Sequence, residues 1–142
     1  SVVDLSSNFA SPNSVDAVVT FRNLHNWIGP QMDTIFENSY KALKPGGIFG
    51  IVEHRANPGT SLDVMKKSGY VTESYAIAIA EKHGFVLVDK SEINANPKDL
   101  KNYERGVWTL PPSLRLKDKD KEKYLEIGES DRMTLLFKKP IN

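Results

Sequence analysis

The chain contains 142 residues, the length of about one domain, because domains most often span roughly 100–150 residues. Hydrophobic residues make up 39% of the sequence and charged residues 26%, which excludes a disordered polar chain. No apolar run approaches the ~20 residues that a membrane-spanning helix needs. The 19 basic and 18 acidic residues leave a net charge of +1, so we expect neither nucleic acid nor a membrane surface as a partner.

The sequence contains no cysteine and opens with no signal-peptide pattern. Disulfides, thiolate nucleophiles and cysteine-based zinc sites are therefore excluded together. We expect a single domain over residues 1–142 in a cytoplasmic protein.

The first half of the chain predicts a strand, a helix and a second strand. Residues 15–21 form a nearly continuous apolar run, typical of a strand that is covered on both faces in a parallel sheet. From Pro30, apolar residues recur at helical spacing, at Met32, Ile35, Phe36, Tyr40 and Leu43. The run Lys44-Pro45-Gly46-Gly47 ends this helix, and residues 48–52 form the next buried strand.

The second half is less regular. Residues 55–70 predict a long loop with at most one helical turn, and Thr72 caps a helix that continues to about His83. A third strand follows at 85–93. Residues from about 94 to 130 are polar and form an insertion, which we call the flap, with a short solvated helix within 118–127.

Residues 132–138 form the last strand. This order of elements predicts an α/β sheet with right-handed crossovers, in which the last strand runs antiparallel because no full helix precedes it. Ligands of such sheets bind beyond the carboxyl ends of the strands. The polar residues that follow the first strand therefore lie where a ligand binds, and they are Thr20, Arg22, Asn23, His25 and Asn26.

Two segments of the sequence resemble part of the sequences of a known family, and they are SVDAVVTFRNLHNW and MDTIFENSYKALKPGGIFGIVEHR. They are similar to the fourth strand, following helix and fifth strand of the class I S-adenosylmethionine-dependent methyltransferases. The resemblance continues in outline to residue 138, where the antiparallel last strand of those enzymes would lie. It implies the distal half of a Rossmann-like methyltransferase sheet, and a transferase that acts on a small molecule.

The chain departs from the family in its cofactor fingerprint. No G-x-G turn occurs anywhere in it, and the acidic residue that ends the second strand of the family and holds the ribose is absent. The N-terminal strands of the family are thus missing from this chain. We expect S-adenosylmethionine to be the cofactor of the intact enzyme, but not to bind this fragment tightly, and we expect the fragment alone to be inactive.

The resemblance also assigns roles to residues. His25, in Leu24-His25-Asn26-Trp27, matches the histidine with which small-molecule O-methyltransferases remove the acceptor proton, although a structural, hydrogen-bonding role is an alternative. Phe21, Arg22 and Asn23 match residues that line the methionine end of the cofactor, and Asp4 matches an acidic residue near the adenine.

The substrate side is predicted from residues at the same rim. Glu53 and His54 end the second strand, followed by Arg55, and can contact an acceptor; Tyr75 can face it from the next helix. Trp108 either covers the pocket as a lid or anchors the flap to the sheet. We expect no metal, because these residues lack a recognised ligand spacing such as H-E-x-x-H.

Two other interpretations stay open. A truncated sheet exposes the edge of the strand at 15–21, and such edges recruit other strands, so the chain can be a non-catalytic fragment that forms a homo-oligomer. The second alternative is the distal half of a nicotinamide-dependent Rossmann enzyme, which would need its own glycine fingerprint upstream.

Overall fold

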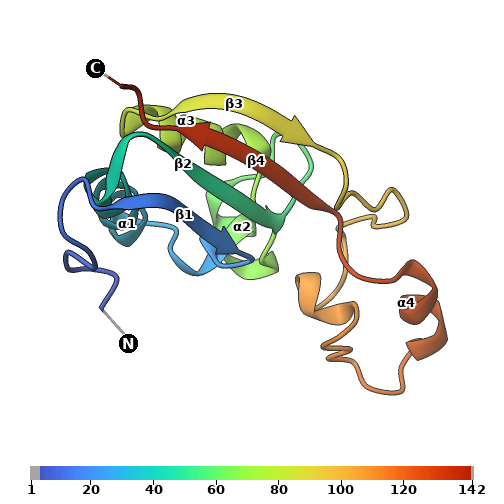
Figure 1. The fold of residues 1–142 in the computed structure, drawn as a ribbon. Coiled ribbons are helices and arrows are strands. Elements are labelled where there is room, and N and C mark those ends of the chain that lie inside the picture. Colours follow the sequence, from blue (N-terminus) through green and yellow to red (C-terminus); the bar gives the residue numbers. More distant parts are fainter. Residues whose placement is uncertain (1–3, 142) are drawn as a thin grey trace.

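The computed structural model describes residues 4–141 (Figure 1). Its strands are β1 (Val15–Phe21), β2 (Leu43–His54), β3 (Val86–Ser91) and β4 (Arg132–Lys138). Its helices are α1 (Pro30–Ala42), α2 (Leu62–Ser68), α3 (Glu73–Lys82) and α4 (Lys121–Ile127), with 3₁₀ turns η1 (Leu24–Asn26) and η2 (Gly106–Thr109). Within residues 4–141, no helix is both long and apolar enough to cross a membrane.

The strands form one mixed sheet in the order β1-β2-β4-β3. β1 runs parallel to β2, with Val19 opposite Gly50 and Phe21 opposite Val52, and α1 is the crossover between them. β4 is inserted between β2 and β3 and is antiparallel to both. The predicted α/β class, the parallel pair and the antiparallel last strand are all confirmed.

Helix α1 ends where the sequence predicts. It begins with Pro30 in its first turn and ends at Ala42, just before the Leu43-Lys44-Pro45-Gly46-Gly47 run. Gly46 has a φ of +84°, and a Cβ on Gly47 would lie 2.9 Å from the carbonyl oxygen of Lys44, so both positions suit glycine. The strand that follows is longer than predicted, because Leu43 already pairs with β1 before regular pairing starts at Ile48.

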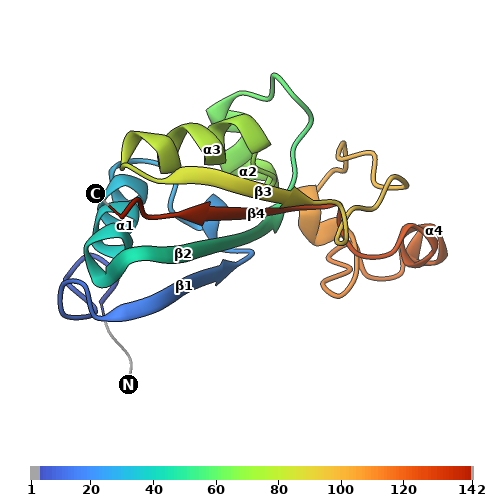
Figure 2. The same cartoon turned by 45° about the horizontal axis from the view of Figure 1, so that its top comes forward.

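The helices α1, α2 and α3 lie on one face of the sheet (Figure 2). On that face Phe49 of β2 contacts Phe36 of α1 and Phe85 at the end of α3, with ring centroids 5.2 Å and 5.1 Å apart. Aromatic pairs at this distance add to the stabilisation that burial itself provides. The core that fixes the sheet therefore lies entirely between the strands and these helices.

The prediction that β1 is buried on both faces is wrong. Val19 is 58% exposed and Phe21 is 56% exposed. Successive side chains of a strand point to opposite faces. Val19 and Phe21 lie two residues apart and share one face, where they line an open surface with residues of β2, β3 and β4. β1 also pairs with β2 alone among the described strands, so it lies at the sheet edge. Apolar composition alone does not distinguish a central strand from an edge strand of this kind.

Residues 55–70 are more ordered than the predicted loop. Helix α2 has two turns, and the Ser61 hydroxyl caps it by accepting from the backbone N–H of Val64. The helix ends at Gly69, which has a φ of +78°. Only Met65 of this helix is buried, which explains why its hydrophobic periodicity was too weak to indicate a helix. Helix α3 begins as predicted, with the Thr72 hydroxyl accepting from the N–H of Tyr75.

The flap extends beyond the carboxyl ends of β1 and β2 (Figure 1). It is attached by close backbone packing, because a Cβ on Gly106 would collide with the backbone of Ser68. A buried carboxylate adds to this attachment: Asp99 accepts from the Tyr70 hydroxyl and from the N–H of Asp131, both at 2.9 Å. The expected short helix within the flap is α4, in which Tyr124 is the only buried residue.

Candidate functional site

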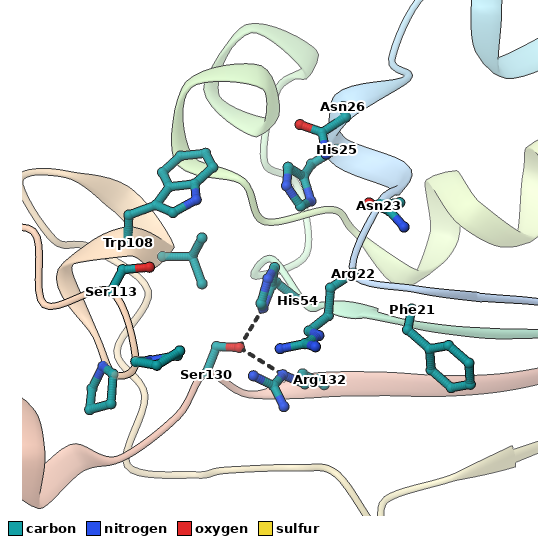
Figure 3. A pocket seen from close by; sticks show the side chains of 13 residues that line it. Phe21, Arg22, Asn23, His25, Asn26, His54, Trp108, Ser113, Ser130 and Arg132 are labelled. Atoms are coloured by element: carbon teal, nitrogen blue, oxygen red, sulfur yellow. Dashed lines mark hydrogen bonds between the residues drawn. The ribbon is translucent and has the colours of Figure 1, made fainter. Parts of the chain in front are cut away.

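A cavity of about 400 Å³ lies at the carboxyl end of β1 (Figure 3). Its walls come from the tip of β1, from η1, from the end of β2, from the flap and from the start of β4. The lining residues are Phe21, Arg22, Asn23, His25, Asn26, His54, Val107, Trp108, Pro111, Pro112, Ser113, Ser130 and Arg132.

The sheet topology explains why these segments meet. β1 and β2 are parallel, so their carboxyl ends lie at the same rim, and β4 is antiparallel, so its beginning lies there too. His54 of β2 is paired with Arg132 of β4 across this rim. The predicted ligand position beyond the strand ends therefore coincides with a cavity that the chain itself forms.

His25 is held by a buried carboxylate. Its Nδ1 lies 3.0 Å and 3.2 Å from the two oxygens of Glu53, which is 0% exposed. The same carboxylate accepts the backbone N–H of His25 and that of His54, each at 2.8 Å. A carboxylate can only accept, so Nδ1 carries the proton and Nε2 keeps a lone pair. His25 is thus oriented as a proton acceptor, and Glu53 lies beneath the cavity instead of lining it as an acceptor contact.

The same residues form the one group of possible metal ligands found in residues 4–141. His25, Glu53 and His54 each offer one ligand atom, and these atoms lie within 4.8 Å of one another. Both oxygens of Glu53, however, already accept hydrogen bonds from a ring nitrogen and from two backbone groups. A metal would have to replace these bonds, so the arrangement suits a carboxylate–histidine pair better than a metal centre.

His54 is held from the other side. Its Nδ1 is hydrogen-bonded to the hydroxyl of Ser130, which also accepts from Nε of Arg132 at 3.2 Å. The pKa of His54 is lowered to about 3, mainly by burial and to a smaller extent by the neighbouring His25, Arg132 and Arg22. His54 is therefore neutral at physiological pH, although it lies beside groups that carry positive charge.

Trp108 lies at the cavity and also at the attachment of the flap. Its ring lies edge-on to His25, with centroids 5.8 Å apart, and it lines the cavity. It also packs on Gly69, where an added Cβ would lie 2.9 Å from the indole, and on the buried cluster formed with Ala56, Tyr70 and Val107. The residue that covers the cavity is thus also the one that fixes the flap to α2.

Arg22 has an unusual backbone conformation. Its φ of +58° lies in the left-handed region, which a non-glycine residue adopts at a cost. Its N–H donates to the carbonyl of Val52 at 2.7 Å, so the chain turns sharply at the end of β1. Within residues 4–141 its guanidinium has no hydrogen-bond or ion-pair partner.

The remaining predicted residues lie away from the cavity. Asp4 lies in the segment before β1, where its carboxylate accepts from the N–H and hydroxyl of Ser6. Tyr75 packs against the core from α3. Arg55 turns away from the cavity and pairs with Glu73, Glu92 and Asp131.

Sequence reasoning missed Ser130 and Arg132, which complete the cavity from the start of β4. The available signal was the polar run Glu129-Ser130-Asp131-Arg132 directly before an antiparallel strand, whose beginning lies at the ligand rim. Ser113 of the flap was missed as well, whereas Asn26, which also lines the cavity, was expected at this rim.

A scan against protein-family models and a search of curated proteins found no match. Solved structures do match. The cyclase SpnF has 17% identity and a TM-score of 0.67, covering 100% of this chain and 57% of its own. A SAM-dependent methyltransferase from Methanosarcina mazei has 15% identity and a TM-score of 0.63, covering 100% of this chain and 67% of its own.

A third match is phosphoethanolamine N-methyltransferase 2 from Haemonchus contortus, in complex with S-adenosyl-L-methionine. Its identity is 20% and its TM-score 0.59, and the match covers 96% of this chain but 36% of the enzyme. The chain has a class I methyltransferase fold. The resemblance read from the sequence is confirmed at the level of the fold, and a cyclase among the matches means that this fold does not by itself fix the reaction.

β4 lies between β2 and β3 and is antiparallel to both, as the resemblance to the class I methyltransferases implies for the last strand. The matches favour the methyltransferase fold over that of a nicotinamide-dependent enzyme. The chain spans 57% of the length of SpnF and 67% of the length of the Methanosarcina mazei enzyme.

Proposed function

We propose that the protein transfers a methyl group from S-adenosylmethionine to a small molecule, and that this chain supplies the acceptor side of the site. The observation that carries the proposal is the pair formed by His25 and Glu53 at the end of the parallel strands. Glu53 orients the ring and fixes the proton on Nδ1, so that Nε2 can accept the proton of an acceptor hydroxyl or amine. General-base catalysis by such a group contributes about 10²–10⁴-fold.

The chain offers one wall for the cofactor. A second hollow of about 410 Å³ lies beside β1 and includes Thr20, Phe21 and Asn23. The Thr20 hydroxyl oxygen is buried there and has no hydrogen-bond partner within residues 4–141. A buried hydroxyl without a partner among apolar side chains suits a nucleoside, whose polar groups can form a hydrogen bond with it. Phe21, Asn23 and the backbone of Arg22 would face the methionine end, while the Arg22 guanidinium lies in the first cavity. Asp4, next to the Leu5 of this hollow, would face the adenine.

The cofactor, when bound, supplies an electrophilic methyl group on a sulfonium, which the acceptor heteroatom displaces in line. His25 accepts the proton that the acceptor loses, Glu53 stabilises the imidazolium that results, and Trp108 excludes water from one side. The chain lacks a glycine-rich turn, so we do not expect it to bind the cofactor tightly alone. We place the intact protein in the cytoplasm.

The test uses a longer protein that contains this chain together with the upstream cofactor turn. His25→Ala should lower turnover by about 10²–10⁴-fold with little change in the affinity for S-adenosylmethionine. His83→Ala is a matched control, because His83 is also paired with a carboxylate, Asp33 at 2.8 Å, but does not line the cavity. Equal loss of turnover in both variants would reduce His25 to a structural role.

We also propose that the chain by itself is non-catalytic and associates through β1. The edge of β1 is unpaired within the described sheet, and its side chains Val19 and Phe21 are more than half exposed. Free edges with apolar side chains recruit further strands. Size-exclusion chromatography with light scattering should show a homodimer or larger species that Val19→Lys disperses, whereas Val88→Lys on the opposite edge strand should not. A monomeric wild-type chain would contradict this.

A further inference from the structure

We propose that the cavity binds an oxyanion, a carboxylate or phosphate group carried by the acceptor substrate, between Arg22, Arg132 and His54. This inference rests on the proposed function, because it names the chemical class of acceptor that the site would take. It is argued from the charge of the cavity wall and from the hydrogen-bonding state of the groups in it.

The cavity wall carries basic side chains and no acidic ones. Among the described residues that line it are two arginines and two histidines, and neither aspartate nor glutamate occurs among them. The nearest carboxylate, Glu53, is buried and fully engaged by His25 and two backbone groups. Within residues 4–141, the positive charge of the cavity is thus compensated by a carboxylate only at Arg132, through the exposed Glu129.

The guanidinium groups of Arg22 and Arg132 differ in how many of their N–H groups remain available to a ligand. Arg22 has no partner within residues 4–141. Arg132 donates through Nε to Ser130 and through one terminal nitrogen to Glu129 at 3.0 Å, a carboxylate that is itself 56% exposed. Five N–H groups belong to each guanidinium, so Arg132 retains donors for a second acceptor. Two guanidinium groups facing one cavity match the fork geometry that binds carboxylate and phosphate.

The position of Arg22 supports the same conclusion. Its left-handed backbone is a conformation that costs of order 1 kcal/mol for a non-glycine residue. Figure 3 shows its guanidinium directed towards Arg132, Ser130 and His54. The lowered pKa of His54, caused by burial and then by His25, Arg132 and Arg22, shows that these charges act on the same place. A strained residue that places an unpaired guanidinium beside a second arginine, whose one carboxylate partner is exposed, indicates a site prepared for an anion.

His54 contributes a neutral donor. The Ser130 oxygen accepts from Arg132, and its own proton is then free to be donated to Nδ1 of His54. In this arrangement Nε2 of His54 carries the ring proton and can donate to an anion. The hydrogen bonds from Arg132 to Ser130 and from Ser130 to His54 therefore connect two of the three anion-binding side chains. Substitution of Arg132 should weaken anion binding by Arg132 itself and by His54.

The test is a titration of the chain with inorganic phosphate, at constant ionic strength maintained with sodium chloride. The side-chain N–H signals of Arg22, Arg132 and Trp108 are followed by NMR. We expect them to shift together and to saturate with a half-point of about 1 mM. Arg22→Gln and Arg132→Gln should each raise this half-point at least about tenfold. Since Arg22 makes no contact that folding needs, its variant remains informative even if Arg132→Gln is unstable.

Arg105→Gln is the matched control, because Arg105 is an exposed arginine of the flap that does not line the cavity. It should leave the titration unchanged. The proposal would be overturned if the NMR shifts did not saturate with phosphate. It would also be overturned if Arg22→Gln and Arg132→Gln both kept the half-point of the unmodified protein. A parallel titration with acetate shows whether a carboxylate or a phosphate binds more tightly.

One more arm separates the acceptor from the cofactor, whose methionine also carries a carboxylate. In the longer protein saturated with S-adenosylhomocysteine, phosphate should still shift the Arg132 signal with an unchanged half-point. Loss of the shift would mean that the arginines hold the cofactor, and the assignment to the acceptor would be wrong. The phosphate titration needs no methyl transfer, so failure of the proposed function would leave its result unaffected.

Discussion

Two clusters of charge lie at the same rim of the sheet and differ in how they are neutralised. Arg55, one residue after β2, is bound by three carboxylates: Asp131 at 3.0 Å, Glu73 at 2.9 Å and Glu92 at 2.7 Å. Arg22 and Arg132 face the cavity, where among residues 4–141 the exposed Glu129 is the one carboxylate that pairs with either of them.

The difference distinguishes structural charge from charge available to a ligand. The pKa of Asp131 falls to about 2 although burial raises it, because hydrogen bonds from Arg55 and Lys101 outweigh that burial. The Arg55 cluster thus connects β2, α3 and β4 and has no capacity left for a ligand. In the cavity, positive charge is brought together without such compensation, an arrangement that stability alone does not favour.

The largest expected effect comes from the compensated cluster. Arg55→Ala should lower the free energy of unfolding by about 3 kcal/mol, because it leaves the carboxylate of Asp131, 6% exposed, with Lys101 as its remaining cation. Arg22→Gln should change it by no more than about 0.5 kcal/mol. Urea denaturation of both variants measures this difference. Similar values for the two would remove the distinction between the clusters.

A smaller effect is expected at the single carboxylate beneath the cavity. Glu53→Gln should destabilise the chain by about 2 kcal/mol, because both carboxylate oxygens accept backbone N–H groups and an amide would oppose one donor with another. The double variant Glu53→Gln with His25→Ala should cost little more than Glu53→Gln alone, because the His25 ring is held by this carboxylate. Full additivity in this cycle would show that the two side chains are not coupled and that Glu53 acts on the backbone alone.

The smallest effect is a dependence of stability on pH. The pKa of His54 falls from 6.5 to about 3 on folding, mainly through burial, so the unfolded chain binds more protons between these values. Stability should therefore decrease as pH falls below 6.5, by at most about 1.4 kcal/mol per pH unit. Between pH 6.5 and 5, His54→Gln should flatten this slope and His83→Gln should retain it. An unchanged slope in His54→Gln would show that folding does not lower the pKa of this ring.

Much of the fold was predictable because its signals are local. Thr72 caps α3, Pro30 begins α1, and the proline and glycines after Leu43 end it, all within a few residues of the groups they affect. Helix α2 escaped prediction because it buries only Met65. The exposure of β1 escaped it because an apolar run has the same composition at a sheet edge as in a sheet centre.

The candidate site was predictable in part. Six predicted residues meet around one cavity, and they are Phe21, Arg22, Asn23, His25, His54 and Trp108. Their positions follow from the rule that parallel strands end at one rim. The role of Glu53 differs from the expected one, because a residue at a strand end can face either the cavity or the interior, and only packing decides which.

The sequence by itself determined the order of the elements, their caps and the position of the ligand rim, since these depend on hydrophobic periodicity and on turn residues close together in the chain. Only the tertiary structure decided which charges are paired. Glu53 holds His25 across 28 positions, and Arg55 holds Asp131 across 76. Such pairings depend on the register of β4 between β2 and β3, which no short stretch of sequence specifies.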